Sequence, residues 1–323
     1  MSLTRRQALA LGSGLLLGSS TRMAQAQDYP NKPVRVIVPF PAGTGLDVDS
    51  RFFTSRLSTL LGQPVIIENR PGAGGTIGAD YAAKAAPDGY TLYMATTPIS
   101  YIELLYTKLN YKPADFTAVS QLALLPGALI ANPGIAAKNA SDLVALSKAK
   151  PGTIRAATQG VGTYSHMAGE WFVAITGASI DFIPYNTSSA ISSVMAGDTQ
   201  VFFNALPPVM SNIAGGKLKA LAITGKSRHP QLPDVPTFNE VGIPGFDLSS
   251  WFGLMAPAAT PSPLIERIAA ACVQIARMPE VIERYRNMGG DPVGNTPAEF
   301  SAFIKAEQAK WGPVVRRTGI KLD

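Results

Sequence analysis

The hydrophobic positions between residues 34 and 61 change from strand-like to helix-like spacing. Residues 34–38 form a short apolar run with several β-branched side chains, which is typical of a strand covered on both faces. Pro39 and Pro41 follow and end the run, because proline has no backbone N–H to donate. Apolar residues then recur at helical spacing, at Phe53, Leu57, Leu60 and Leu61. The pattern predicts a strand, a turn and a helix that lies against a sheet.

The alternation of strand and helix continues along the next residues. The sequence predicts strands at 65–68 and 90–95 and a helix at 77–86, in the order β-α-β-α-β. Strands in this order are parallel, and the turns that follow them meet at one edge of the sheet. Open α/β sheets bind ligands at that edge, so these turns are the first candidates for a site.

A second α/β unit follows from residue 128 onward. Its strands are expected at 128–132, 153–158, 181–185, 201–205 and 220–224, and its helices at 141–150, 166–176 and 190–196. Residues 225–246 are rich in proline, glycine and charge, and we expect one short helix near 238–241. A strand at 248–255 precedes a helical segment from Pro263 onward, broken at Pro279, Gly289-Gly290 and Pro297.

A chain of this length exceeds a single hydrophobic core, so two lobes are expected. We assign 27–126 plus 252–323 to lobe 1 and 127–251 to lobe 2, with crossing segments near residues 125 and 250. The last helices are expected to cover lobe 1, because no long helix follows the strands of lobe 2 before Trp251. The glycine turns of the two lobes would then face each other across a ligand cleft.

Residues 1–26 have the composition of a secretory signal peptide. Arg5 and Arg6 precede a short apolar run, and Ala24-Gln25-Ala26 matches a small-residue cleavage site. The run is too short to cross a membrane, and no cysteine at the cleavage site offers a lipid anchor. We therefore expect an exported protein in the periplasm, with a signal that suits either the Sec or the twin-arginine route.

Charge and residue counts argue against several classes of function. Removing residues 1–26 leaves 25 Lys and Arg against 22 Asp and Glu, which lowers the formal charge from +6 to +3. So mild an excess, without a basic run, does not indicate a nucleic-acid partner. Cys272 is the only cysteine and lies in an apolar helical stripe, which indicates a core residue. His166 and His229 have no acids or cysteines at ligand spacing, so we expect neither a metal nor a cofactor.

The first turn combines small residues with a helix-capping pair. Thr44 and Asp47 have capping-box spacing, and Gly43 and Gly45 leave backbone N–H groups accessible at the start of the helix. Such a turn suits an anion. It has neither a G-x-G-x-x-G fingerprint nor the lysine of a P-loop, so a carboxylate fits better than a nucleotide. The alternative is structural, because α/β turns commonly contain glycine and capping alone would explain Thr44 and Asp47.

Several groups of residues match one known family. Three of them are Val38-Pro39-Phe40-Pro41-Ala42-Gly43, Glu68-Asn69-Arg70-Pro71-Gly72-Ala73-Gly74-Gly75 and Ala86-Pro87-Asp88-Gly89-Tyr90. Further matches are Gly162-Thr163 with Ser165-His166, Pro184-Tyr185, and Trp251 with Gly253-Leu254. Over essentially its whole length after residue 26, the chain resembles the Bug family, the TctC-like substrate-binding components of tripartite tricarboxylate transporters.

The resemblance implies an α/β fold of the two-lobed type II periplasmic-binding-protein class, the Venus flytrap. It also implies a binding protein without catalytic residues, which captures a small di- or tricarboxylate and delivers it to membrane permease subunits. We expect such a protein to act as a monomer. In this family the first turn and the turn at 158–166 clamp one carboxylate through backbone N–H groups, hydroxyls and bridging waters.

Carried onto this sequence, the resemblance predicts a set of ligand-binding residues. The first turn contributes Phe40, Ala42, Gly43, Thr44 and Asp47, and the opposite turn contributes Thr163 and Ser165. The remaining candidates are Thr96, Gly162, Tyr164, Tyr185, Asn186, Asn204 and Trp251. Neutral, fixed dipoles of this kind can hold a carboxylate without the cost of burying a counter-charge.

Two departures from the family pattern bear on specificity. Members commonly have a glycine where Thr44 stands, so this chain adds a hydroxyl or narrows the approach there. A basic residue and a glycine usually follow Pro-Tyr; because Asn186 and Thr187 stand there instead, a cation for a distal carboxylate is expected to be missing. The aromatic candidates are compatible with an aromatic carboxylate such as a phthalate, although Tyr185 and Trp251 are equally open to a core role.

Two other functions compete with this interpretation. The pair Ser165-His166 suggests an exported hydrolase, but adjacent residues at a helix start point apart, and no G-x-S-x-G elbow surrounds Ser165. A receptor that docks on a sensor kinase would have the same fold, and it stays open because docking surfaces are not readable from this sequence.

Overall fold

The computed structural model describes residues 29–185, 187–225, 227–246 and 249–322. The predicted signal peptide and the site candidate Asn186 lie outside these residues. Within this part of the chain, no helix is both long enough and apolar enough to cross a membrane.

The first group of elements is the predicted β-α-β-α-β unit. Strands β1 (Val34–Val38), β2 (Val65–Asn69) and β3 (Thr91–Thr96) are parallel, with β1 in the middle. Helix α3 (Gly45–Leu61) buries Phe53, Leu57 and Leu61, three of the four residues of the predicted stripe. Helix α4 (Thr76–Ala83) ends three residues earlier than predicted, ahead of Pro87.

The second group contains the predicted α/β elements with small shifts of their ends. Strand β5 (Arg155–Thr158) pairs in parallel with both β6 (Asp181–Pro184) and β7 (Val201–Ala205). The helices of this group are α6 (Ala140–Ala149), α7 (Tyr164–Thr176), α8 (Thr187–Ala196) and the short α9 (Met210–Ala214). Strand β8 (Lys219–Ile223) pairs with β4. The helix predicted near 238–241 is wrong, because these residues form turns.

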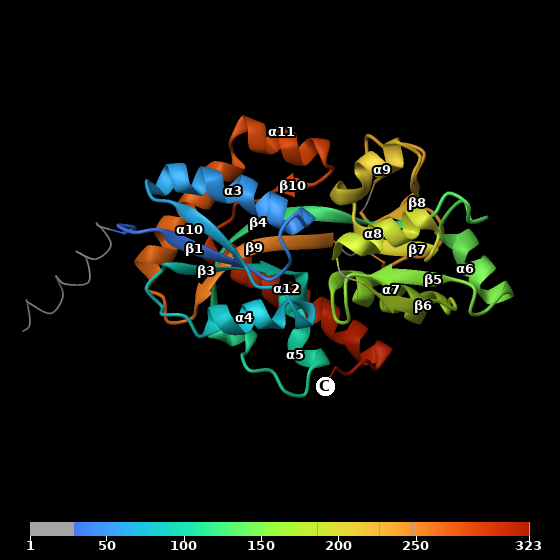
Figure 1. The fold of residues 1–323 in the computed structure, drawn as a ribbon, viewed down its shortest axis with the longest axis horizontal. Helices are drawn as coiled ribbons and strands as arrows, with labels where there is room; N and C mark the ends of the chain where they lie inside the picture. Colours follow the sequence, from blue (N-terminus) through green and yellow to red (C-terminus); the bar gives the residue numbers. More distant parts are fainter. Residues whose placement is uncertain (1–28, 186, 226, 247–248, 323) are drawn as a thin grey trace, which may run out of the picture.

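Two long antiparallel strands connect the two groups. Strand β4 (Phe116–Ala131) pairs with β9 (Ser249–Pro257) up to Pro126, and from Gly127 onward it pairs with β7. The sequence predicted only the second part of β4, because polar and small residues interrupt its first part and Pro126 lies near its middle. The sheet therefore runs without a break in the order β2-β1-β3-β9-β4-β7-β5-β6, and Figure 1 shows its two halves side by side along the long axis.

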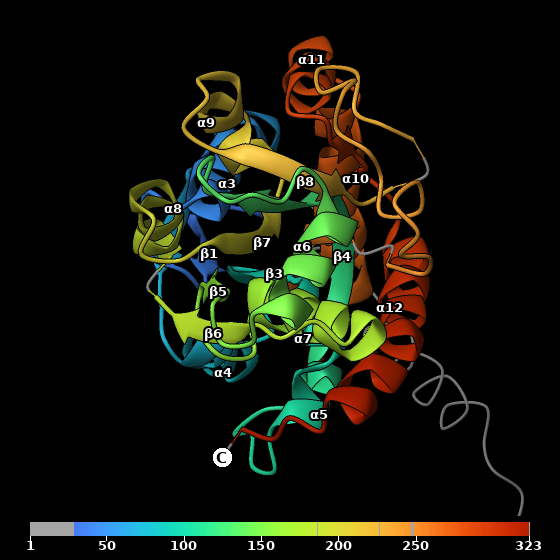
Figure 2. The ribbon, with the colours of Figure 1, turned by 90° about the vertical axis from the view of Figure 1, so that its right-hand side faces the viewer.

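The remaining elements are short helices and the C-terminal helices. The short ones are η1 (Ala73–Gly75), η2 (Thr97–Ser100), α5 (Ile102–Leu105), η3 (Pro113–Asp115) and η4 (Pro207–Val209). The C-terminal elements are α10 (Ser262–Ala276), α11 (Pro279–Asn287), β10 (Asp291–Pro292) and α12 (Pro297–Thr318). Figure 2 shows α10, α11 and α12 along one side of the molecule.

Helix α12 packs against both groups, whereas the sequence assigned the C-terminal helices to lobe 1. Near its start, Phe300 packs against Trp251 of β9. Near its end, Trp311 packs against Tyr101 and against Trp171 of α7. The expectation for the last helices therefore holds for α10, which packs on α3 and β4, but only for the first part of α12. The lobe boundaries themselves stay a prediction.

Cys272 is a core residue, as its apolar stripe indicates. Its side chain is fully buried on α10 among the apolar residues that α3 and the first strands contribute. Burial raises the pKa of its thiol to about 12, which leaves it protonated and unreactive at neutral pH.

A glycine on β9 marks a close approach between the sheet and α12. A Cβ atom added at Gly253 would lie 2.5 Å from Phe300 Cζ and 2.8 Å from the backbone oxygen of Ser120. We expect Gly253→Ala to lower the free energy of unfolding by about 1–3 kcal/mol, because overpacking forces neighbours out of place. Urea unfolding measures this, with Lys305→Ala on the exposed side of α12 as a control that changes little. A Gly253→Ala variant as stable as the wild type would contradict this packing.

Candidate functional site

A cavity of about 420 Å³ lies between the two groups of elements. It is bordered by the turn between β1 and α3, the end of β3, the start of α7, β7, η4 and the crossing strands β4 and β9. This size falls within the range of small-molecule pockets. The cavity is therefore the candidate ligand site.

The first turn is built around a buried carboxylate. Thr44 is the N-cap of α3, as predicted, and its Oγ1 accepts a hydrogen bond from the backbone N–H of Asp47 at 3.4 Å. The Asp47 carboxylate does not accept a hydrogen bond from the Thr44 N–H, as it would in a capping box. Instead, one of its oxygens accepts from the Gly43 N–H and from Arg51 Nε, both at 2.9 Å. Its other oxygen accepts from Asn69 Nδ2 at 2.9 Å. Asp47 thus stabilises the conformation of the turn without itself lining the cavity.

The pKa of Asp47 reflects this bracing role. Burial alone would raise it, but the hydrogen bonds from Arg51, the Gly43 N–H and Asn69 outweigh that effect. The pKa of this carboxyl therefore lies below its ordinary value, and Asp47 is ionised at neutral pH.

The opposite turn is also fixed by its own hydroxyls. Thr163, the residue before α7, donates from Oγ1 to the Gly160 carbonyl at 2.7 Å. Ser165 Oγ lies 3.0 Å from Thr163 Oγ1 and accepts from the Gln159 N–H at 2.9 Å. These bonds set the direction of the first turn of α7.

Two helix N-termini consequently border one cavity. Thr44, Gly45 and Leu46 at the start of α3 and Thr163 and Tyr164 at the start of α7 all belong to its lining. The first backbone N–H groups of a helix have no partner within the helix and carry partial positive charge. An anion placed between the two starts would be stabilised by both.

Three buried side-chain donors in the lining lack a partner. They are Asn204 Nδ2, Trp251 Nε1 and Arg284 Nε, which have almost no solvent exposure and no hydrogen-bond partner among the described residues. A buried donor without a partner costs free energy, so such groups in a cavity indicate a polar ligand or bound water. Trp251 also packs edge-on against Phe300 and Phe303, so it has a core role and a cavity role at once.

The structure brings together most, but not all, of the predicted site residues. The cavity lining includes Phe40, Gly43, Thr44, Thr96, Thr163, Tyr164, Asn204 and Trp251. Five other candidates are outside the lining, namely Ala42, Asp47, Gly162, Ser165 and Tyr185. Asp47 and Ser165 brace the two turns from behind, and Gly162 donates its N–H to His166 Nδ1. Tyr185 packs against apolar residues beside β7 and α8.

The part of the lining that comes from the region of α11 and from the interior of α3 was not predicted from the sequence. Arg284 of α11 and Met288, the residue after α11, line the cavity together with Val48 and Asp49 of α3. No local pattern indicates this approach, because α11 lies more than 200 residues from α3 in the chain. From Asn186 and Thr187 we expected a cation for a distal carboxylate to be missing; the lining nevertheless contains a cation, Arg284.

Arg284 is held by an ion pair within the lining. Its Nη2 lies 2.8 Å from Asp49 Oδ1, and its guanidinium carbon lies 4.4 Å from the centre of the Phe52 ring. Burial raises the pKa of Asp49 more than the hydrogen bond and charge of Arg284 lower it, so the net shift is upward. The side chain of Arg284 keeps about a third of its surface exposed.

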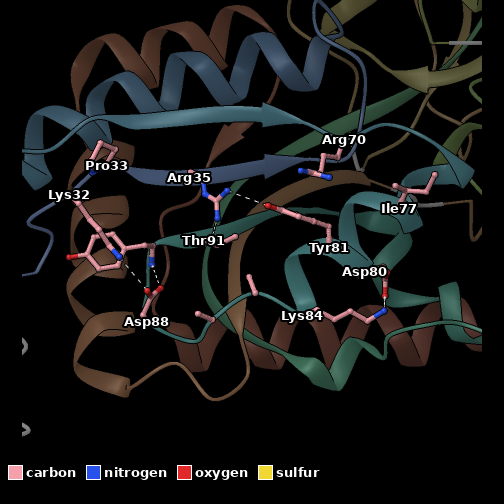
Figure 3. Close-up of a pocket in the computed structure, with 13 residues that line it drawn as sticks. Lys32, Pro33, Arg35, Arg70, Ile77, Asp80, Tyr81, Lys84, Asp88 and Thr91 are labelled. Carbon is pink, nitrogen blue, oxygen red and sulfur yellow. Dashed lines mark hydrogen bonds and ion pairs between the residues drawn. The ribbon is translucent and has the colours of Figure 1, made fainter.

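A second and larger hollow lies on the outer face of the first group, beside β1 and α4 (Figure 3). Its volume is about 700 Å³, and its cations are Lys32, Arg35, Arg70 and Lys84. Each of them pairs with a carboxylate, at distances between 2.6 and 3.6 Å. Because its cations are already paired with carboxylates, this hollow is a weaker candidate for an anion site than the cavity, whose lining has unpaired donors.

The pair Ser165-His166 does not form a nucleophile and base. Ser165 Oγ bonds to Thr163 and Gln159, while His166 Nδ1 accepts from the Gly162 N–H at 3.2 Å. Burial lowers the pKa of His166, and its Nε2 lies 3.6 Å from Glu170. This arrangement supports the turn at the start of α7 and not hydrolysis.

Comparison with solved structures assigns the class of protein. The chain is similar to the periplasmic binding protein BugD, with a TM-score of 0.85 and 30% identity over 91% of this chain and 99% of that one. It is equally similar to Rpa4515 of R. palustris with adipate, with a TM-score of 0.86, 30% identity and coverage of 91% and 99%. MatC from Rhodopseudomonas palustris with bound malate gives a TM-score of 0.84 and 30% identity over 89% and 100%. The fold is the α/β periplasmic-binding-protein fold.

Residues 50–320 match the model of the tripartite tricarboxylate transporter family receptor. The chain belongs to this family, which confirms the resemblance inferred from its motifs. It is a binding protein of a transport system and not an enzyme.

The buried carboxylate behind the first turn yields a prediction on stability. At neutral pH we expect Asp47→Asn to lower the free energy of unfolding by about 1–3 kcal/mol, because charge-assisted hydrogen bonds are lost. The folded pKa of Asp47 lies below its unfolded value, so this stabilisation is present above about pH 4 and is lost as the pH falls through the folded pKa. Urea unfolding at several pH values measures it.

The exposed Asp198 provides the control. Asp198→Asn should change the free energy of unfolding by less than about 0.5 kcal/mol at neutral pH. If the deficit of Asp47→Asn stayed constant from neutral pH down to about pH 3, the bracing role of its charge would be refuted.

Proposed function

We propose that this protein captures a small carboxylate in the cavity between its two groups of elements. The observation that carries the proposal is that two helix N-termini and the unpaired buried donors of Asn204 and Trp251 border one cavity. Solved relatives hold carboxylates, adipate in Rpa4515 and malate in MatC, which supports the same class of ligand here. The ligand is a di- or tricarboxylate, and an aromatic one such as a phthalate is included because Tyr164 and Trp251 line the cavity.

One carboxylate binds between the starts of α3 and α7. Backbone N–H groups of the two helix starts donate to it, and Asn204 Nδ2 supplies a side-chain donor. Fixed neutral dipoles stabilise the anion without the desolvation cost of a buried counter-ion. The hydroxyls of Thr163 and Ser165 and the carboxylate of Asp47 hold these donors in position.

Ligand capture involves closure of two lobes, 27–126 plus 252–323 and 127–251. The two groups already approach each other closely across the cavity. A Cβ atom at Gly45 of α3 would lie 3.0 Å from Pro208 Cγ, and one at Gly74 would lie 3.0 Å from the Val161 oxygen. Strands β4 and β9 are the connections about which the lobes move, while α12 contacts both.

The protein works in the periplasm and passes its ligand to the membrane permease subunits of a tripartite tricarboxylate transporter. Membership of the receptor family and the likeness to periplasmic binding proteins support this. The signal peptide at residues 1–26 provides export, and the protein acts as a monomer.

A thermal-shift screen tests the proposal. Residues 27–323 are mixed with mono-, di- and tricarboxylates, both aliphatic and aromatic. A ligand at about a hundred times its dissociation constant should stabilise the protein by about 2.7 kcal/mol, a shift of several degrees. If no carboxylate shifts the melting temperature, the proposed function fails.

Asn204 provides a point test of the same site. For any carboxylate that binds, we expect Asn204→Ala to weaken binding by about 1–3 kcal/mol, because a buried carboxylate loses one donor. Titration calorimetry measures the affinity. Asn287→Ala on the exposed end of α11 is the matched control and should bind as the wild type does. Wild-type affinity in a folded Asn204→Ala variant would remove this side chain from the site.

A further inference from the structure

Arg284 is a cation in the cavity lining that the clamp for one carboxylate does not use. It comes from α11, whereas the donors of that clamp come from the starts of α3 and α7 and from β7. Its guanidinium has five N–H donors, and Asp49 is its only hydrogen-bond acceptor among the described residues. The Nε–H is buried and has no partner there. Donors therefore remain for a second anion.

The surroundings of Arg284 fix its position. Asp49 holds one edge of the guanidinium at 2.8 Å, and the Phe52 ring lies against its face at 4.4 Å. A planar cation held on an aromatic face and by one carboxylate loses little freedom when it binds a second carboxylate. The Asp49 side chain is nine-tenths buried, so its charge carries a desolvation penalty in the folded protein. An ion pair on the open surface, with a purely structural role, would avoid this penalty.

The lining shared by these two polar ends is mostly apolar. Its apolar members include Leu125, Ile191, Pro207, Pro208, Phe252 and Met288. A hydroxyl or amino group of a ligand body that lies against these six side chains would lose water without gaining a hydrogen bond; the polar partners of the lining, such as Thr96, Thr97, Gln159 and Ser250, lie elsewhere in it. A hydrocarbon body, aliphatic or aromatic, suits them.

We propose that the ligand is a dicarboxylate with an unsubstituted hydrocarbon body, whose distal carboxylate binds Arg284. This inference rests on the proposed function, since it takes the clamp at the helix starts as the site of the first carboxylate. Arg284 is then the residue that selects dicarboxylates over monocarboxylates. The apolar lining selects unsubstituted bodies over hydroxylated ones.

The first test compares matched ligands on the wild-type protein by titration calorimetry. The pairs adipate and hexanoate, suberate and octanoate, and terephthalate and benzoate differ in the second carboxylate. At least one dicarboxylate should bind more tightly than its monocarboxylate by on the order of 10- to 100-fold, the value of a charge-assisted hydrogen bond. Equal affinities within all three pairs would overturn the inference.

The second test removes the cation. Arg284→Gln should reduce that preference for the dicarboxylate by about 10-fold or more, while the affinity for the monocarboxylate stays unchanged. Arg286→Gln, two residues along α11 and exposed, is the matched control and should keep the preference. If Arg284→Gln keeps it as well, Arg284 is not the distal site.

Loss of Arg284 also leaves the buried Asp49 unpaired, which can impair folding. The double variant Asp49→Asn with Arg284→Gln removes both charges and keeps a neutral pair of similar size. It should fold and show the same loss of preference as Arg284→Gln. Wild-type preference in the folded double variant would overturn the inference.

A further pair tests the apolar body, since succinate and malate differ by one hydroxyl. We expect succinate to bind at least as tightly as malate, and tighter binding of malate would refute the selection against hydroxylated bodies. These outcomes separate the two proposals. If no carboxylate binds the wild type, the proposed function fails; if carboxylates bind without dependence on Arg284, only the further inference fails.

Discussion

The antiparallel pairing of β4 with β9 is the constraint on which the rest of the structure depends. These two strands carry the sheet from one α/β group into the other, and β4 changes partners at Pro126 and Gly127. Their pairing sets the distance at which the start of α3 faces the start of α7. Gly253 shows how tightly the pairing is packed, because Phe300 of α12 fills the space a side chain would occupy. The cavity is therefore a consequence of where the two groups are joined.

The proposed recognition in this cavity combines two different kinds of electrostatics. At the inner end, helix N-termini and the amide of Asn204 offer dipoles, which cost little to bury and suit a carboxylate deprived of water. At the other end, Arg284 is a full charge whose desolvation is limited by partial exposure and by Asp49. In this proposal the fixed dipoles provide most of the binding affinity, and the cation and the apolar lining provide the selectivity among ligands.

Local patterns predicted most of the elements because their causes are local. The β-branched run of β1, the stripe of α3, the N-cap at Thr44 and the core position of Cys272 each depend on residues a few positions apart. The predictions that failed or fell short depend on distant partners. The first part of β4 is a strand because β9 pairs with it, and α12 extends over both groups because Tyr101 and Trp171 pack against Trp311. Residues 238–241 form turns in which Phe238 is buried against Phe172 and Phe246, two partners that lie in other segments of the chain.

The sequence by itself determined the α/β fold class, the family and the two turns that carry backbone donors, because glycine, proline and capping residues act on their own neighbours. The tertiary structure decided which of those residues reach the cavity. It put Asp47 and Ser165 behind the turns as braces, since their side chains bond to backbone groups on the side away from the lining. It also brought Arg284 to Asp49 across 235 positions of the chain. Neither the spacing of residues nor their periodicity contains such a contact, because it arises only when α11 packs beside α3.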